Sequence, residues 1–131
     1  MLLKYSIGIV GVVLLSCWNF FNPNIQEPTL PKVMYQLDSE AKVLRERILK
    51  KKSLGVFTDS IQDMHIAIPT DPDEMTPEFH QMASYSLNLR KEIYRAKHPK
   101  QIYQKYIQSC ITCHETHCPG PIRRIEQLKL K

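Results

Sequence analysis

Apolar residues recur at helical spacing in three long stretches of the chain. In the first stretch they alternate between three and four residues apart, at Met34, Leu37, Ala41, Leu44 and Ile48. Because this spacing keeps side chains on one face of an α-helix, it predicts an amphipathic helix of about five turns beginning near Val33. The lysine run 50–52 follows at its end, where cations suit the helix dipole.

The second long helix is predicted to begin at Thr76-Pro77-Glu78, a capping hydroxyl followed by a proline and an acid. Its apolar face comprises Phe79, Met82, Ala83, Ser86, Leu87, Leu89 and Ile93. Between the two long helices we expect a shorter helix from Thr58 to Ala67, which Pro69 would end because proline cannot continue the hydrogen-bond ladder.

The third long helix is predicted to begin at Pro99 and to stop at the Cys118–Pro121 segment. One side of this helix carries Ile102, Tyr106, Cys110, Cys113, His114 and His117. A final short helix is expected from Ile122 to Leu130. No stretch shows the alternation typical of a strand, and short connections favour antiparallel neighbours. The sequence therefore predicts an all-α fold, an up-down four-helix bundle in residues 33–131.

Length and charge narrow the class of protein. The 131 residues suffice for one domain, and four cysteines are too few for a disulfide-built scaffold. The net charge is +4 over residues 1–52, −6 over 53–89 and +7 over 90–131, an asymmetry that can orient the approach of a charged partner. The chain is predicted to be exported and has no recognisable nucleic-acid module, so nucleic-acid binding is not expected.

The N-terminus has the layout of a secretory signal, with Lys4 followed by an apolar run from Ile7 to Leu15. The tetrapeptide Leu14–Cys17 resembles the lipobox of bacterial lipoproteins. By that resemblance residues 1–16 are a cleaved signal peptide, Cys17 carries a lipid, and residues 17–32 are a tether that holds the domain on the periplasmic side of a bacterial membrane. The alternative is an uncleaved anchor helix from Met1 to about Phe21.

The residues from Cys110 to His114 read C-x-x-C-H. On a helix both thiols and the imidazole project from one side, so Cys110 and Cys113 can add to the two vinyl groups of one haem while His114 binds its iron. Three alternatives are a thiol–disulfide exchange pair, a zinc site that also uses His117 and Cys118, and a structural disulfide.

With this motif on its last long helix, the chain resembles the class II c-type cytochromes of the cytochrome c-prime family. The resemblance covers roughly residues 34–117 and rests on CITCH at 110–114. It implies a four-helix bundle with one covalent haem c, thioether bonds from Cys110 and Cys113, and His114 as axial ligand. The tail 117–131 extends past the usual end of the family.

In an up-down bundle, the other side of the iron faces the layer formed by the beginnings of the first and second long helices and the end of the short one. Relatives with six-coordinate iron take a methionine from the first helix, so Met34 is the leading candidate for the sixth ligand and His65 is the second. An open or water-bound position is the third possibility.

Two functions from different classes follow. A six-coordinate iron indicates an electron carrier that serves a redox partner protein, and this is the function we expect. A five-coordinate iron indicates a cytochrome that binds or senses a small diatomic gas. A small subunit of a larger redox complex and a homodimer are further possibilities. No nucleophile–base arrangement suggests an independent enzyme.

Overall fold

The structure is a computed structural model that describes residues 27–131. The expectations for the signal peptide 1–16, for Cys17 and for residues 18–26 lie outside the described residues. Within residues 27–131 the backbone is helical apart from loops and one isolated bridge between Thr29 and Ile68. The prediction of an all-α fold is confirmed for this part of the chain. None of its helices is long and apolar enough to cross a membrane.

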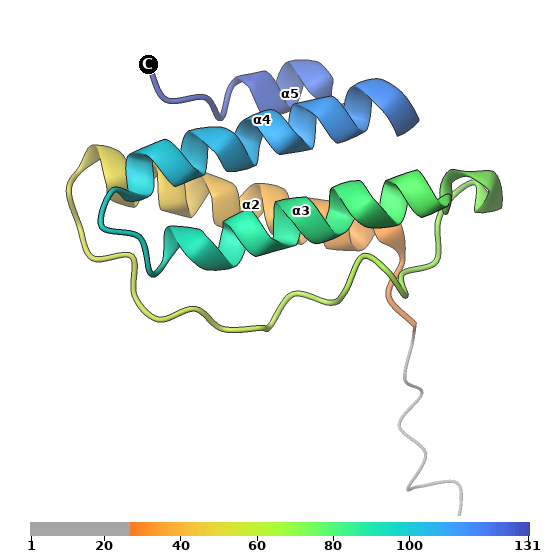
Figure 1. The fold of residues 1–131 in the computed structure, drawn as a ribbon, viewed down its shortest axis with the longest axis horizontal. Coiled ribbons are helices and arrows are strands. Elements are labelled where there is room, and N and C mark those ends of the chain that lie inside the picture. Colours follow the sequence, from red (N-terminus) through yellow and green to blue (C-terminus); the bar gives the residue numbers. More distant parts are fainter. Residues whose placement is uncertain (1–26) are drawn as a thin grey trace, which may run out of the picture.

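The described residues 27–131 form the helices α2 (Leu30–Leu49), η1 (a 3-10 helix, Pro72–Glu74), α3 (Pro77–Ile93), α4 (Pro99–His117) and α5 (Ile122–Glu126) (Figure 1). Helix α2 begins three residues before the predicted position, with Pro31 in its first turn. Residues 30–32, which the sequence assigned to the tether, are therefore helical. Helix α5 ends at Glu126 rather than at Leu130.

The predicted starts of α3 and α4 are confirmed. The side-chain oxygen of Thr76 accepts a hydrogen bond from the backbone N–H of Phe79 at 3.1 Å, and Pro77 occupies the first turn. Helix α4 begins at Pro99 and continues without interruption to His117. Both helices therefore begin where local residue chemistry favours a helix start.

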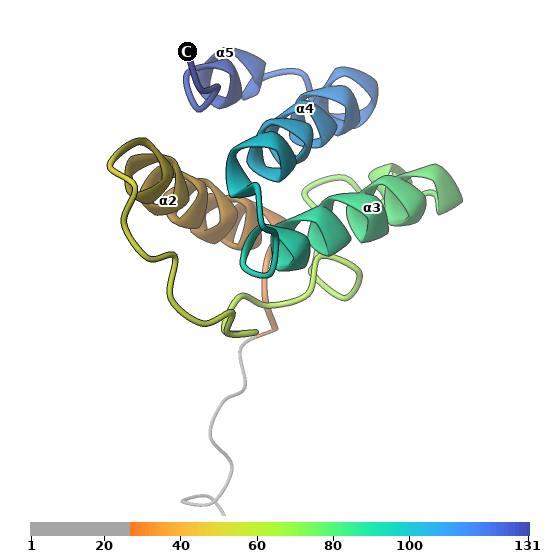
Figure 2. The ribbon, with the colours of Figure 1, turned by 60° about the vertical axis from the view of Figure 1, so that its left-hand side comes forward.

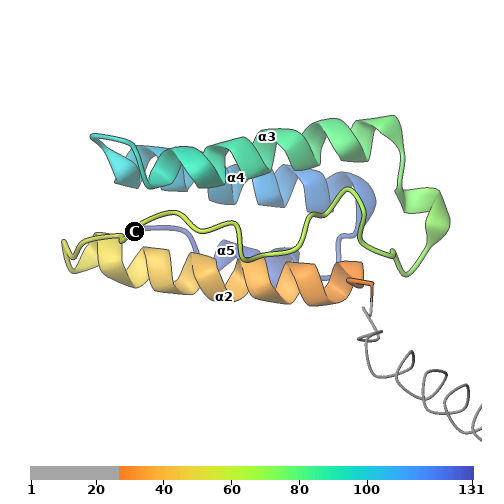
Figure 3. The same ribbon diagram turned by 90° about the horizontal axis from the view of Figure 1, so that it is seen from below.

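The prediction of a helix from Thr58 to Ala67 is wrong. Residues 52–60 have no helical structure, and the rest of this stretch holds only a turn at 64–66. The chain must return from the end of α2 to the start of α3, and these two helices run in the same direction (Figure 3). Ten extended residues cover roughly 33 Å, whereas ten helical residues cover about 15 Å. An extended segment therefore makes this return with fewer residues.

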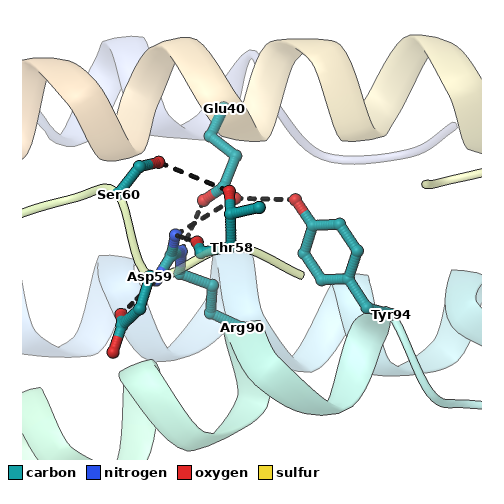
Figure 4. A network of polar contacts seen from close by, with 6 residues as sticks. All are labelled: Glu40, Thr58, Asp59, Ser60, Arg90 and Tyr94. Carbon is teal, nitrogen blue, oxygen red and sulfur yellow. Dashed lines mark hydrogen bonds and ion pairs between the residues drawn. The ribbon is translucent and has the colours of Figure 1, made fainter. Parts of the chain in front are cut away.

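A buried polar network holds the extended segment in place (Figure 4). The guanidinium of Arg90, 1% exposed, forms two hydrogen bonds with the carboxylate of Glu40 and donates to the carbonyl oxygen of Thr58 at 3.4 Å. The hydroxyl of Tyr94 donates to the same carboxylate at 2.7 Å. Arg90 thus connects α2, α3 and the extended segment, which sequence periodicity does not reveal.

Four helices surround a common interior (Figure 2). Helix α4 runs antiparallel to α2 and α3, while α5 lies beside α4 on the side facing α2 (Figures 1 and 2). Because the successive long helices α2 and α3 run in the same direction, the predicted up-down order is wrong for this pair (Figure 3). The hydroxyl of Tyr103 on α4 donates to the carbonyl oxygens of Ala41 and Leu128, both at 3.1 Å. The C-terminal tail is therefore part of the core.

The core divides into two apolar clusters. The first comprises Ala41, Leu44, Leu89, Ile93, Tyr103, Tyr106, Ile107, Ile111, Ile125, Leu128 and Leu130. The second comprises Leu30, Val33, Leu37, Met64, Ala67, Phe79 and Ala83. Cys110 packs against the first cluster and Met34 against the second. The residues predicted to bind a cofactor therefore belong to both clusters.

Candidate functional site

The C-x-x-C-H residues lie on the last turns of α4, which reaches His117. Cys110, Cys113 and His114 all line one cavity between the helices, which we call the core hollow. The helical spacing thus brings both thiols and the imidazole to a common space, as the sequence predicted.

The core hollow has a volume of about 90 Å³ and lies where the two apolar clusters meet. Its other lining residues are Met34, Leu37, Asp38, Ala41, Met64, Ala83, Ser86, Leu87, Tyr106, Ile107, Pro121, Arg124, Ile125 and Leu128. Its apolar walls and few polar groups are typical of cofactor sites.

A second cavity, the end hollow, adjoins the first and has a volume of about 260 Å³. It lies where α2 begins, α3 begins and α4 ends, and it is lined in part by Leu30, Phe79, His117 and Cys118. The residues that line both hollows are Met34, Cys113, His114, Pro121 and Arg124. The two spaces are therefore separated by little more than these side chains.

The imidazole of His114 is held by the end of its own helix. Its Nδ1 atom lies 2.8 Å from the carbonyl oxygen of Cys118. A carbonyl can only accept, so Nδ1 carries the proton and Nε2 keeps its lone pair. No hydrogen bond within residues 27–131 uses Nε2. This is how a metal-binding histidine is usually held, with one nitrogen bonded to a carbonyl and the other free for the metal.

Burial changes the chemistry of the two thiols. It raises the pKa of Cys110 to about 12, with a smaller contribution from the nearby Cys113. Burial also raises the pKa of Cys113, and Cys118 adds to that shift. Thiol–disulfide exchange needs a thiolate, which these shifts disfavour. Within residues 27–131, moreover, no three His, Cys, Asp or Glu side chains converge as a metal site.

The two candidates for a sixth ligand lie in different places. Met34 lines both hollows together with His114. His65 lines neither of them, because its Nδ1 lies 2.9 Å from Nδ1 of His80 and its Nε2 lies 3.2 Å from the hydroxyl oxygen of Ser84. The structure thus brings Met34, but not His65, to the cavity that the C-x-x-C-H residues line.

Asp38 is a polar residue of the core hollow that the sequence reasoning missed. Its side chain is 8% exposed, and Oδ1 lies 3.5 Å from Nε of Arg124 without a hydrogen bond. Asp38 follows Met34 by four residues and so falls on the same helix face, a signal that could have identified it. In the end hollow, the buried Nε2 of His117 also lacks a hydrogen-bond partner among the described residues.

The residues around these hollows fit a covalently attached haem. The soft sulfur of Met34 and the imidazole of His114 are both established haem-iron ligands. The walls are largely apolar, and Arg124 supplies a cation that can pair with a haem carboxylate. Oδ1 of Asp38 and Nε2 of His117, which lack hydrogen-bond partners among the described residues, belong to side chains that line the core hollow and the end hollow, respectively.

Comparison of the chain with protein-family models, with curated proteins and with solved structures finds no match.

Proposed function

We propose that this protein is a membrane-tethered, extracytoplasmic c-type cytochrome with one haem that carries electrons to or from a redox partner protein. The observation that carries the proposal is the common lining of the core hollow by Cys110, Cys113, His114 and Met34. Three of these residues form the attachment motif, and the fourth comes from a helix 76 positions earlier in the chain.

Each residue has a distinct role in the proposal. Cys110 and Cys113 would hold the haem through thioether bonds to its two vinyl groups. His114 binds the iron through Nε2, while its Nδ1–H bond to the carbonyl of Cys118 sets the plane of the ring. Met34 would hold the iron through its sulfur atom. The bound haem supplies reversible one-electron chemistry, and a Met/His ligand pair raises its potential.

The location of the protein in the cell is part of the same proposal. Cys17 is the lipid-carrying residue, and residues before α2 form the tether to a bacterial membrane. Replacing Cys17 with serine should then move the protein from the membrane fraction to the soluble fraction. Retention of the Cys17→Ser variant in the membrane would instead indicate an uncleaved anchor helix.

An absorbance spectrum tests the electron-carrier proposal. After expression with a c-type maturation system, the reduced protein should show sharp α and β bands, which indicate six-coordinate, low-spin iron. It should also return to its oxidised spectrum with a chemical oxidant. A broad high-spin band that sharpens with carbon monoxide would overturn the carrier function in favour of gas binding.

A further inference from the structure

A third hollow lies at the opposite end of the bundle from the C-x-x-C-H residues. It has a volume of about 520 Å³ and lies between the end of α2 and the beginning of α4 (Figure 1). Helix α4 is about 28 Å long, so this hollow is far from the C-x-x-C-H residues at the other end of the helix. Its polar lining is almost wholly basic, with Lys51, Lys52, Lys97, Lys100 and His98. No Asp or Glu is among its lining residues. We call it the lysine hollow.

The four lysines of this hollow have no carboxylate partner within ion-pair distance in residues 27–131, although Lys52 acts on Glu46 at longer range. Elsewhere in these residues Lys42, Lys50 and Lys129 form ion pairs, whereas Lys32, Lys91, Lys105 and Lys131 form none. Like charges gathered in one concave space repel one another and attract counter-ions. All four lysines are exposed, so their common positive potential is open to an anion that approaches from solvent.

The backbone at Lys51 adds a second cost. Helix α2 ends in a Schellman turn, in which the N–H of Lys52 donates to the carbonyl of Arg47 at 2.8 Å and the N–H of Lys51 donates to that of Ile48. Lys51 has φ of +51°, the left-handed conformation that this turn requires and that glycine adopts most readily. A lysine thus occupies the position at which glycine would be more stable.

The beginning of α4 adds a third energetic cost. Cations are unfavourable near the N-terminus of a helix, yet Lys97, His98 and Lys100 all lie there. The first turn has no acid and no side-chain cap, in contrast to α3, which has the Thr76 cap and Glu78. Helix stability therefore does not explain why these cations are present.

We propose that the lysine hollow binds an anion that carries more than one phosphate group. Lysine ammonium groups bind phosphate as compact point charges, and four of them are available here. The volume is in the range of small-molecule sites, larger than one inorganic ion needs. The phosphate groups can belong to a soluble polyphosphate or to the headgroups of an anionic lipid. This site is remote from the candidate haem site, so the two proposals can be tested separately.

Calorimetric titration of the purified full-length protein with inorganic pyrophosphate tests the proposal. We expect saturable binding that weakens as NaCl is added. Lys51→Gly should weaken it about fivefold, the equivalent of roughly 1 kcal/mol, while relieving the left-handed backbone rather than straining it. Lys100→Gln should have a similar effect. The matched control is Lys105→Gln, which removes the same charge from the same helix at a residue outside the hollow.

The source of the phosphate is distinguished with vesicles. If the protein binds phosphatidylglycerol vesicles more strongly than phosphatidylcholine vesicles, and if Lys51→Gly and added pyrophosphate both reduce that binding, the hollow binds lipid headgroups. If the protein binds both kinds of vesicle equally and still binds pyrophosphate in the titration, the hollow binds a soluble anion. Absence of pyrophosphate binding would overturn the proposal. An equal loss of affinity in Lys105→Gln would also overturn it, because net charge alone would then account for the binding.

Discussion

His114 and Cys118 are joined by two hydrogen bonds at the end of α4. The N–H of Cys118 donates to the carbonyl of His114 at 3.0 Å, and Nδ1 of His114 lies 2.8 Å from the carbonyl oxygen of Cys118. Both bonds use the backbone of Cys118, and its side chain is exposed. The geometry therefore orients the imidazole through backbone atoms of Cys118, and the Cys118 thiol takes no part in holding the ring.

The first prediction concerns this thiol. Cys118→Ser should leave both haem content and the absorbance spectrum unchanged, because the backbone that holds His114 is retained. Cys113→Ser is the matched comparison, since it removes one of the two thioether bonds and should lower haem content. Haem content per protein, measured by the pyridine haemochrome assay, checks both variants. A loss in Cys118→Ser as large as that in Cys113→Ser would contradict this assignment.

The second prediction concerns the sixth ligand. Met34→Ala should convert the oxidised spectrum from low-spin to high-spin, because Met34 lines the hollows that His114 lines. Met82→Ala is a suitable control, since Met82 lines only an outer groove between α3 and α4. His65→Ala should also leave the spectrum unchanged, because His65 lines neither hollow. A low-spin spectrum in Met34→Ala would remove Met34 as ligand.

The third prediction concerns the buried pair of Arg90 and Glu40. Arg90→Met leaves a carboxylate that is 18% exposed without its cation, which should cost about 3–5 kcal/mol of unfolding free energy. Adding Glu40→Met should recover part of that loss, because the unpaired buried charge is then gone. Urea denaturation of both variants measures the difference. If Arg90→Met costs no more than the neighbouring Lys91→Met, the network does not hold the extended segment.

How far the fold can be predicted depends on the range of the interactions that decide it. The starts of α3 and α4 are encoded by Thr76, Pro77 and Pro99 themselves, so the sequence predicts them. The conformation of residues 58–67 depends on contacts with distant parts of the chain, among them the bond from Arg90 to Thr58, 32 positions away, and the bridge between Ile68 and Thr29. Its local pattern of Ile61, Met64 and Ile68 resembles a helix face, and local periodicity was therefore misleading.

The candidate site also has residues that local spacing predicts and contacts that it does not. Cys110, Cys113 and His114 lie within one helical turn, so their spacing alone predicts that they share a face. The pairing of Asp38 with Arg124 depends on α5 packing beside α2, a tertiary contact across 86 positions that no local pattern contains. Met34 was predicted through a family resemblance, and His65 was proposed from its level in the bundle.

The fourth prediction concerns alkaline pH. Burial and a hydrogen bond to Glu40 raise the pKa of Tyr94 above its ordinary value near 10, so the folded protein holds the phenol proton more tightly than the unfolded chain does. Its contribution to stability is therefore complete below about pH 10 and is lost as pH rises above that value. Buried Tyr103 and Tyr106 act in the same direction.

Unfolding free energies between pH 8 and pH 12 check this dependence. Tyr94→Phe should be less stable than the wild type at pH 8 but should lose less stability on going above about pH 10. Tyr35→Phe, at a position 65% exposed, is the control and should follow the wild type at every pH. A Tyr94→Phe variant with the same alkaline slope as the wild type would contradict the predicted effect.

Covalent haem is the central claim, and mass spectrometry tests it most directly. The protein should be expressed with a c-type maturation system and extracted with acidified acetone, and its intact mass compared with that of a Cys110→Ala/Cys113→Ala variant. We expect the wild type to retain the mass of one haem on the peptide that contains Cys110 and Cys113, and we expect the variant to lack it. A wild-type protein whose mass contains no haem, with both thiols open to alkylation after denaturation, would contradict it.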